Sequence, residues 1–439
     1  MYTGCVQKID LFFSPLLPRP SIWTELNALL TKDDPILPRL HWVALIHQYT
    51  YGESWKAESG LLALLSPRLR WARIDGAYDD KDWDTLVANH LLAHCPNLEG
   101  VTIANTEWMA LLSNHQRLEM LHVHGDDPRT EYLACMANWP ALRSLTFNTR
   151  SLSRSDLPNL VSLPFLQNLE INVEPYRCCL SSPPPSRLSA SLPSLRSLSY
   201  TLYDGGYAED LSVPLDAIGA AYVHLTELTL IVRSLWSSLI IHLSDILTPL
   251  APLQRLRVVN ITIKGEYMSY NAHDLRRIPV VWPALVELRI AAGLYAQGSD
   301  DDVAPLCVLP DLTRALPELR VRHLPQTAFT AGVLDVVGAG AGPPHRAVYD
   351  LRLGPVKVRG WREDGWEEDA KREVRTFLGA LFPNAGHRVE VQMNGACSTA
   401  FLRALTQVDA TSEFTPGKIC ERSVKPKHDV PLVSPRVMR

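Results

Sequence analysis

Two stretches of this 439-residue sequence, Trp139 to Phe147 (WPALRSLTF) and Trp282 to Ile290 (WPALVELRI), are nearly the same although more than a hundred residues separate them. Each opens with tryptophan and proline and continues with apolar residues at the spacing L-x-x-L-x-F or L-x-x-L-x-I. A short strand directs alternate side chains to one side, so the fourth and sixth positions of this pattern point into the same core. The pattern therefore predicts a turn followed by a short strand with an apolar inner face.

The same six-position pattern recurs along most of the chain. Between Leu40 and Leu285 its first positions lie 20 to 32 residues apart. Periods of this length predict a repeat array, in which each unit buries its apolar face against the next unit. The copies begin at Val6, Leu40, Leu69, Leu98, Leu118, Leu142, Leu166, Leu195, Leu225, Leu253 and Leu285, with weaker copies at Leu316, Val348 and Gly386.

These copies in register, many with a proline before the first leucine as in LPRL, CPNL, LPFL and LPSL, resemble the leucine-rich-repeat family over residues 5 to 391. The resemblance implies an α/β solenoid of horseshoe or arc form, with a parallel concave sheet and with helices or loops on the convex side. We expect regular repeats over residues 5–322 and degenerate repeats over residues 323–391.

Helices are predicted between the strands, where apolar residues recur at helical spacing. A further amphipathic helix, with acidic residues in its first turn, is predicted over residues 366–382 as a terminal cap or last unit. Beyond the array we expect a terminal helix over residues 392–410 and a disordered basic tail over residues 411–439. The segments predicted to be helical between strands are 21–30, 83–95, 130–139 and 237–250.

Composition is that of a soluble, folded protein, with 46% hydrophobic and 21% charged residues. The formal net charge of -4 gives no reason to expect a nucleic-acid or membrane partner. The chain lacks a secretory start and a bilayer-spanning run, so we expect a cytoplasmic or nuclear protein. Its eight cysteines have irregular spacings without a C-x-x-C pair, and we expect them to be small buried apolar groups.

The sequence CPNLEGVTI overlaps the end of the helical segment NHLLAHC, the pattern LPxLxxLxI recurs, and the repeat lengths are uneven. These features are similar to the repeat region of F-box proteins, notably the large fungal families. In that family an F-box docks on a cullin-type ubiquitin ligase, and the repeats select the substrate. No segment before Leu40 reads as an F-box, so the resemblance covers the recognition half, and ligase docking would require an F-box supplied upstream. A stand-alone regulator, which inhibits an enzyme or stimulates a GTPase, remains the alternative.

A protein partner is expected to bind the concave face of the sheet. Positions three and five, and the residue after position six, point there, away from the core. These positions are aromatic and histidine-bearing near the N-terminus, small and polar in the middle, and charged later; tryptophan and arginine are enriched among interface hot spots. The candidate binding residues are Trp42, Trp71, Arg73, Met120, His122, His124, Asn148, Asn172, Arg255, Arg257, Glu287 and Arg289.

Two motifs have spacings that resemble those of metal-binding and nucleotide-binding sites. The pairs His90/His94 and His122/His124 have ligand-like spacing for zinc, but a convex helix and a concave strand would carry them, so they cannot converge. The glycine-rich stretch Asp335 to His345 has Pro343 at the third glycine position of the dinucleotide-binding pattern and no following helix, so a flexible loop is the better interpretation. We therefore expect a non-enzymatic protein with no catalytic residues, metal or cofactor, and we do not expect a small-molecule ligand. An enzyme within residues 325–410 stays open only because the pattern weakens there.

Overall fold

A computed structural model provides the fold of this chain, which divides into two units, Met1–Met393 and Asn394–Arg439. The second unit, with most of the predicted terminal helix and the whole predicted tail, lies outside the described residues. The structure describes residues 6–13, 37, 39–47, 65–75, 81–104, 107–124, 134–149, 163–173, 192–204, 211–234, 240–293, 303–325, 327–330, 344–354, 356–359, 366–384 and 386–389.

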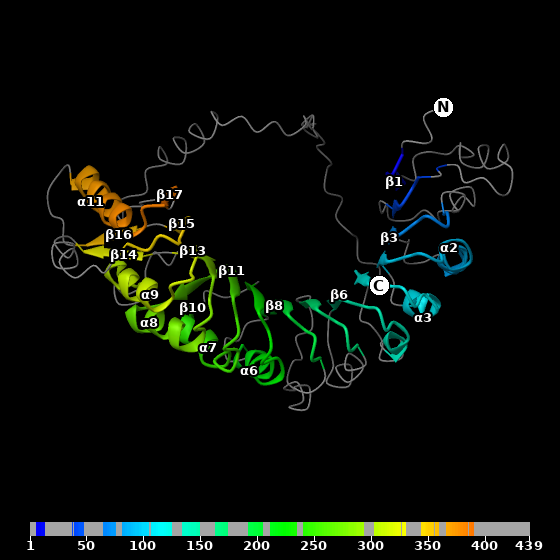
Figure 1. The fold of residues 1–439 in the computed structure, drawn as a ribbon, viewed down its shortest axis with the longest axis horizontal. Coiled ribbons are helices and arrows are strands. Elements are labelled where there is room, and N and C mark those ends of the chain that lie inside the picture. Colours follow the sequence, from blue (N-terminus) through cyan, green and yellow to red (C-terminus); the bar gives the residue numbers. More distant parts are fainter. Residues whose placement is uncertain are drawn as a thin grey trace, which may run out of the picture. The chain divides into compact units, whose positions relative to one another are not determined.

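One long parallel sheet forms the backbone of the first unit, and its strands follow one another in chain order (Figure 1). It has 15 strands among the described residues, and only β10, which pairs with β11, lies off the sequential path. A separate two-stranded sheet pairs β14 (Thr327–Thr330) with β16 (Val356–Arg359). The strands of the long sheet are β1 (Lys8–Phe13), β2 (Trp42–His47), β3 (Trp71–Asp75), β4 (Gly100–Ile103), β5 (Met120–Val123), β6 (Ser144–Thr149), β7 (Asn168–Val173), β8 (Ser197–Asp204), β9 (Glu227–Ser234), β10 (Ile240–His242), β11 (Val258–Ser269), β12 (Glu287–Gly293), β13 (Val321–Leu324), β15 (Asp350–Leu353) and β17 (Gly386–Val389).

A tight turn explains the proline of the repeated phrase. The amide of Leu142 donates to the carbonyl of Trp139 at 3.1 Å, and the amide of Leu285 donates to the carbonyl of Trp282 at 3.3 Å. Proline suits the second position of such a four-residue turn, because its fixed φ is the one required there and its missing amide is not needed. The same bond closes the turns that end at Leu40, Leu69, Leu98, Leu118, Leu166, Leu195, Leu225, Leu256 and Leu319.

Each turn also attaches its unit to the preceding one. The amides of Arg143 and Ser144 both donate to the carbonyl of Glu119, at 2.8 and 3.0 Å. The next unit repeats this arrangement, because the amides of Gln167 and Asn168 donate to the carbonyl of Arg143 at 2.8 and 2.9 Å. The register between neighbouring units is therefore set before the strand begins, which keeps the apolar positions of successive strands side by side.

The core lies behind the sheet and is built from the predicted template positions. Leu142, Leu145 and Phe147 are all buried, and Leu228 occupies the same position as Leu145 three strands further along. Each unit thus completes the interior of its neighbour, and the predicted core is confirmed. A leucine truncated to alanine in this setting costs about 2–5 kcal/mol.

Three of the later template copies were placed outside the true frame, two of them by three residues. Strand pairing puts Val259, not Leu256, beside Leu228 and Leu288. It likewise puts Arg322, not Leu319, beside Leu288. In both units an additional buried leucine precedes the true first position and mimics the pattern. Pairing of β15 with β17 puts His387, not Val389, beside Leu351, so the copy assigned to Gly386 is shifted by two residues.

The helices lie along one side of the sheet (Figure 1). The predictions for residues 83–95 and 366–382 are confirmed by α2 and α11. In the predicted segment 130–139, the described residues Ala134–Asn138 form a short 3-10 helix instead of an α-helix. In the segment 237–250, the described part, from Ile240 onward, has a three-residue strand and a five-residue helix; residues 21–30 lie outside the described residues. The helical elements are α2 (Lys81–His94), α3 (Trp108–Leu112), η3 (Ala134–Asn138), α6 (Ser212–Ala221), α7 (Leu243–Leu247), α8 (Ala272–Val281), η8 (Leu306–Val308), α9 (Leu309–Ala315) and α11 (Trp366–Leu381).

Local sequence fixes the start of α8. The side chain of Asn271 accepts the amide of Asp274 at 3.1 Å, and the Asp274 carboxylate accepts the amide of Asn271 at 3.0 Å. This reciprocal capping box satisfies amides that have no partner inside the helix. It anchors the helix that carries Arg276 toward the next repeat.

The cysteines that the structure describes fit the expectation in part. Cys95 is buried, whereas Cys135 and Cys307 are half-buried. Burial raises the pKa of the Cys95 thiol to about 12, so the group stays protonated at neutral pH. Cys95 therefore behaves as a small apolar core residue.

Sequential parallel strands, a shared leucine core and helices on one side define a leucine-rich-repeat solenoid, as predicted. None of the helices in the described part of the chain is long and apolar enough to cross a lipid bilayer.

Candidate partner-binding face of the sheet

The sheet has one face turned away from the core, which we call the outer face. On β5, Leu121 and Val123 are fully buried, while Met120 is 40% exposed and His122 is half-buried. This alternation is the period of an extended strand with one buried side. Positions three and five therefore lie on the outer face, as expected, wherever the template frame is right.

A pair of tryptophans marks the first strands of the outer face. Trp42 and Trp71 are register partners on β2 and β3, and their rings stack with centroids 6.1 Å apart and planes at 29°. The Trp42 indole donates to Asp10 Oδ1 at 3.1 Å, and Lys8 Nζ lies 4.8 Å from the Trp42 ring centroid. A cation over an indole face and a carboxylate on its N–H hold the ring in one orientation. Both tryptophans remain partly exposed.

Gly100 makes room for the second tryptophan. It follows Trp71 in the same row of the sheet, on β4. A Cβ atom placed on Gly100 would overlap the six-membered ring of Trp71, so the indole occupies the space of the missing side chain. Gly100 is not among the predicted binding residues, although a glycine at a strand position where neighbours carry large side chains is a signal of close approach.

The histidines are divided between two layers. His122 and His124 lie on β5 and directly after it, with ring centroids 3.9 Å apart. His90 and His94 lie on α2, with ring centroids 5.5 Å apart. Within the described residues no group of three or more histidine, cysteine, aspartate or glutamate side chains is placed to hold a metal ion.

Small polar residues cover the middle of the outer face. Glu170 accepts from Thr146 Oγ1 at 3.4 Å and from Asn172 Nδ2 at 3.2 Å. Asn148 is the register partner of Asn172, and its side chain lies outside the described residues. The structure thus places the predicted Asn172 in a network with Glu170, a central carboxylate.

Charged side chains occupy the last strands. Arg289 pairs with Glu287 at 3.2 Å on β12. Asp350 on β15 contacts His323 Nε2 at 3.0 Å and accepts from Arg352 Nε at 3.2 Å. Burial alone would raise the pKa of Asp350, but the hydrogen bonds from His323 and Arg352 outweigh it and lower the pKa. The Asp350 carboxylate is therefore ionised at neutral pH.

Two predicted residues do not belong to the outer face. Arg255 lies in the turn before β11, and Arg257 directly precedes that strand, because the true frame of this repeat starts at Leu256. Val258 and Asn260 occupy the outer positions instead. Arg257 lies 3.9 Å from Glu318, which is in the turn before β13, two repeats further along, and Arg257 is exposed at the rim of the sheet.

The predicted binding residues omit three side chains of β13 and β15. With the repeat frame set at Leu316, His323 fell outside the template. The frame set at Val348 was right, but its outer positions Asp350 and Arg352 are not among the predicted residues. In the structure Arg289, His323 and Arg352 are successive register partners across β12, β13 and β15. They form a row of basic side chains at one end of the outer face.

The chain's sequence matches no protein-family profile and no curated protein. Among solved structures, 119 chains match its fold. One of them is the plant peptide hormone receptor RGFR1 in complex with RGF2, with 11% sequence identity and a TM-score of 0.35; the alignment covers 80% of this chain and 58% of the receptor chain. This chain thus spans less than two thirds of the length of the receptor chain, and the likeness concerns the fold alone.

Proposed function

We propose that this protein is a non-enzymatic scaffold that binds a protein partner on the outer face of its sheet. The observation that carries the proposal is the stacked pair Trp42 and Trp71, held partly exposed on the sheet by Lys8, Asp10 and Gly100. Partly exposed, orientationally fixed tryptophans offer large apolar contact at low conformational cost. Neither tryptophan is part of the buried leucine core.

Met120 extends this apolar area. It follows Gly100 in the same row, on β5, and is 40% exposed. Methionine and tryptophan are enriched in interface cores, and methionine adapts to irregular partner surfaces. We therefore place the energetic centre of partner binding over β2 to β5. The charged row of Arg289, His323 and Arg352 would add selectivity more than affinity.

The finer proposal is that these repeats select substrates for a cullin-type ubiquitin ligase, with the F-box supplied by a segment or subunit outside the described residues. The support for this proposal is the sequence pattern of the repeats, which is similar to that of F-box proteins. In this function the protein works in the cytoplasm or nucleus.

The test is affinity capture from cells that express the protein, followed by mass spectrometry. Wild-type protein is compared with Trp42→Ser and Met120→Lys, which change the outer face, and with Val280→Ser as the matched control. Val280 is 77% exposed on helix α8, on the other side of the core, so its substitution leaves the outer face intact. Circular dichroism verifies that all variants are folded.

We expect a reproducible partner that both outer-face variants lose and Val280→Ser retains. Recovery of the same partners by all four proteins would contradict binding on the outer face. Cullin-complex subunits among the captured proteins would support the ligase role. A single stoichiometric enzyme or GTPase without those subunits would favour the stand-alone regulator.

A further inference from the structure

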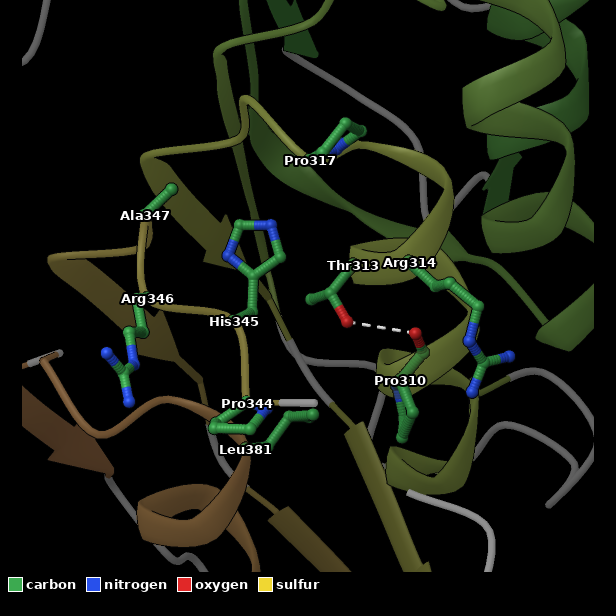
Figure 2. A pocket seen from close by; sticks show the side chains of 9 residues that line it. All are labelled: Pro310, Thr313, Arg314, Pro317, Pro344, His345, Arg346, Ala347 and Leu381. Carbon is green, nitrogen blue, oxygen red and sulfur yellow. Dashed lines mark hydrogen bonds between the residues drawn. The ribbon is translucent and has the colours of Figure 1, made fainter. Parts of the chain in front are cut away.

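A cavity of about 310 Å³ lies on the helical side of the last repeats (Figure 2). Its walls come from α9, from the segment leading into β15 and from the end of α11. The volume is within the range of small-ligand sites, about 300–1,000 Å³. We infer that this cavity binds a small molecule through a carboxylate or phosphate group. The site is separate from the outer face and goes beyond the proposed function.

Hydrogen bonds fix the wall that contains His345 and Arg346. The amide of His345 donates to the carbonyl of Leu381 at 2.8 Å, and Asn384 Nδ2 donates to the carbonyl of Arg346 at 2.9 Å. The His345 ring bonds the carbonyl of Leu316 through Nε2 at 3.2 Å. Segments from two repeats and the last helix are thus joined around the cavity, which lowers the entropic cost of binding.

The opposite wall is fixed by α9. Thr313 Oγ1 donates to the carbonyl of Pro310 at 2.9 Å, a bond seen in Figure 2. Pro317 and Pro344 also line the cavity, and their rings restrict the backbone on either side. These contacts leave a stiff, half-open hollow whose lining is mostly apolar and contains a few polar groups.

The titratable side chains lining the cavity are all basic. They are Arg314, His345 and Arg346, and no aspartate or glutamate is among the described lining residues. In Figure 2 the imidazole of His345 lies between Arg346 on one side and Thr313 and Arg314 on the other. The Arg346 guanidinium has no ion-pair partner among the described residues, so its fork remains available for an oxyanion.

His345 adds an unused polar atom. Since Nε2 faces a carbonyl, which only accepts, Nε2 carries a proton. The other ring nitrogen, Nδ1, is buried and has no hydrogen-bond partner among the described residues. A buried nitrogen without a partner is costly unless a ligand or water satisfies it. In this tautomer Nδ1 is a hydrogen-bond acceptor, so only an occupant that donates a proton, such as a water molecule or the P–OH of hydrogenphosphate, would satisfy it.

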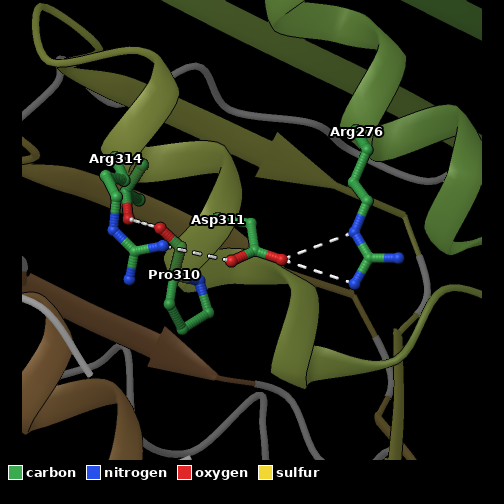
Figure 3. A network of polar contacts seen from close by, with 5 residues as sticks. Arg276, Pro310, Asp311 and Arg314 are labelled. Atoms are coloured by element: carbon green, nitrogen blue, oxygen red, sulfur yellow. Dashed lines mark hydrogen bonds and ion pairs between the residues drawn. The ribbon is translucent and has the colours of Figure 1, made fainter. Parts of the chain in front are cut away.

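Asp311 anchors Arg314 rather than neutralising the cavity. Its carboxylate lies 3.4 Å from Arg314 and 3.4 Å from Arg276 of α8, so one acid is shared by two arginines (Figure 3). Asp311 does not line the cavity. Positive charge therefore exceeds negative charge around the site, and Arg314 starts from a defined position. An anionic group is the complementary ligand chemistry.

Isothermal titration calorimetry on the full chain tests the inference, with inorganic phosphate and succinate as probes at constant ionic strength. We expect saturable binding of at least one probe with a Kd of about 1 mM or tighter. Arg314→Gln and Arg346→Gln should each weaken it about tenfold, as expected for loss of a charge-assisted hydrogen bond. Arg375→Gln, which changes an exposed arginine of α11 that does not line the cavity, is the matched control and should bind as wild type.

Phosphate binding without succinate binding assigns the site to phosphorylated ligands, and succinate binding assigns it to carboxylates. No saturable heat with either probe, or equal binding by the Arg314→Gln/Arg346→Gln double variant, would overturn the inference. Thermal unfolding of each unliganded variant establishes that it is folded. Partner capture by the outer face is unaffected by either result, so the two proposals fail independently.

Discussion

The most unusual residue of the core is an arginine at a leucine position. Arg322 on β13 lies between Leu288 and Leu351 of the neighbouring strands, and it is fully buried. None of its guanidinium nitrogens has a hydrogen-bond partner among the described residues. We predict that Arg322→Leu stabilises the protein, because it restores the apolar row and removes an unpaired charge from the core.

The magnitude follows from burial. Desolvation, opposed weakly by the nearby Tyr270, lowers the pKa of Arg322 to about 9, from an ordinary value of 12.5. At about 1.4 kcal/mol per unit, keeping this cation in the core costs on the order of 5 kcal/mol. Leucine is smaller and leaves some unfilled space, which offsets part of the gain. We expect the free energy of unfolding to rise by about 2–4 kcal/mol.

Urea denaturation followed by tryptophan fluorescence measures the change, provided that the slope of the transition is unchanged. Arg322→Met, which keeps the length of the side chain without its charge, should also stabilise. Arg320→Leu, at an exposed position two residues earlier, is the control and should change stability by less than about 0.5 kcal/mol.

The effect has a defined pH dependence. The pKa of the folded state is lower than that of the unfolded state, so the unfolded chain holds the proton more tightly between these values. The penalty on wild type is therefore constant from pH 6 to 8 and decreases as pH rises above about 9. If Arg322→Leu and Arg322→Met both lower the free energy of unfolding by more than about 1 kcal/mol, the guanidinium has a buried partner and the reasoning is refuted.

Three further substitutions test other contacts. Trp139→Phe should cost about 1–3 kcal/mol more than Trp282→Phe, because the first removes an indole hydrogen bond to the carbonyl of Leu112, whereas the second removes a buried indole N–H that has no partner among the described residues; equal losses in denaturation would contradict this. Gly100→Ala should destabilise by about 1–3 kcal/mol, since the methyl displaces the tryptophan that covers it, whereas Gly379→Ala, with open space around the new atom, should be neutral or stabilising. Asp350→Asn should lower stability at pH 7, and the difference should shrink as pH falls below 3.8, the pKa in the unfolded chain, and be lost as pH falls through the lowered pKa of the folded state; a difference that does not shrink on acidification would argue against the ion-pair role.

The repeated phrase was sufficient to predict the fold. A proline turn, a strand and two inward-pointing apolar positions are local features, and each copy of the pattern contains all of them. Leu142, Leu145 and Phe147 were identified as one unit from the sequence because spacing alone decides which side chains share a strand face. The helix over residues 366–382 was predicted for the same reason, since its apolar stripe is a local period.

Register and side-chain partners required the tertiary structure. Leu253 fits the template as well as Leu256 does, and Leu316 fits it better than Leu319, whose frame puts Arg322 at an apolar position; only pairing with the neighbouring strands identifies the true frame. The correct register shows that Arg322 occupies a leucine position of the core and that Arg255 lies outside the outer face. The sequence pattern gives the length of a repeat, but it does not show which residues of one repeat lie beside which residues of the next.

The cavity around His345 illustrates the same limit. Its walls come from α9, the segment before β15 and the end of α11, which are far apart in sequence. No local spacing relates Arg314 to Arg346, and only the stacking of successive units brings them to one site. The sequence by itself determined the repeating unit, because a strand and its turn are short-range structures. The tertiary structure alone decided which charged groups meet, because such contacts depend on how the units align with one another.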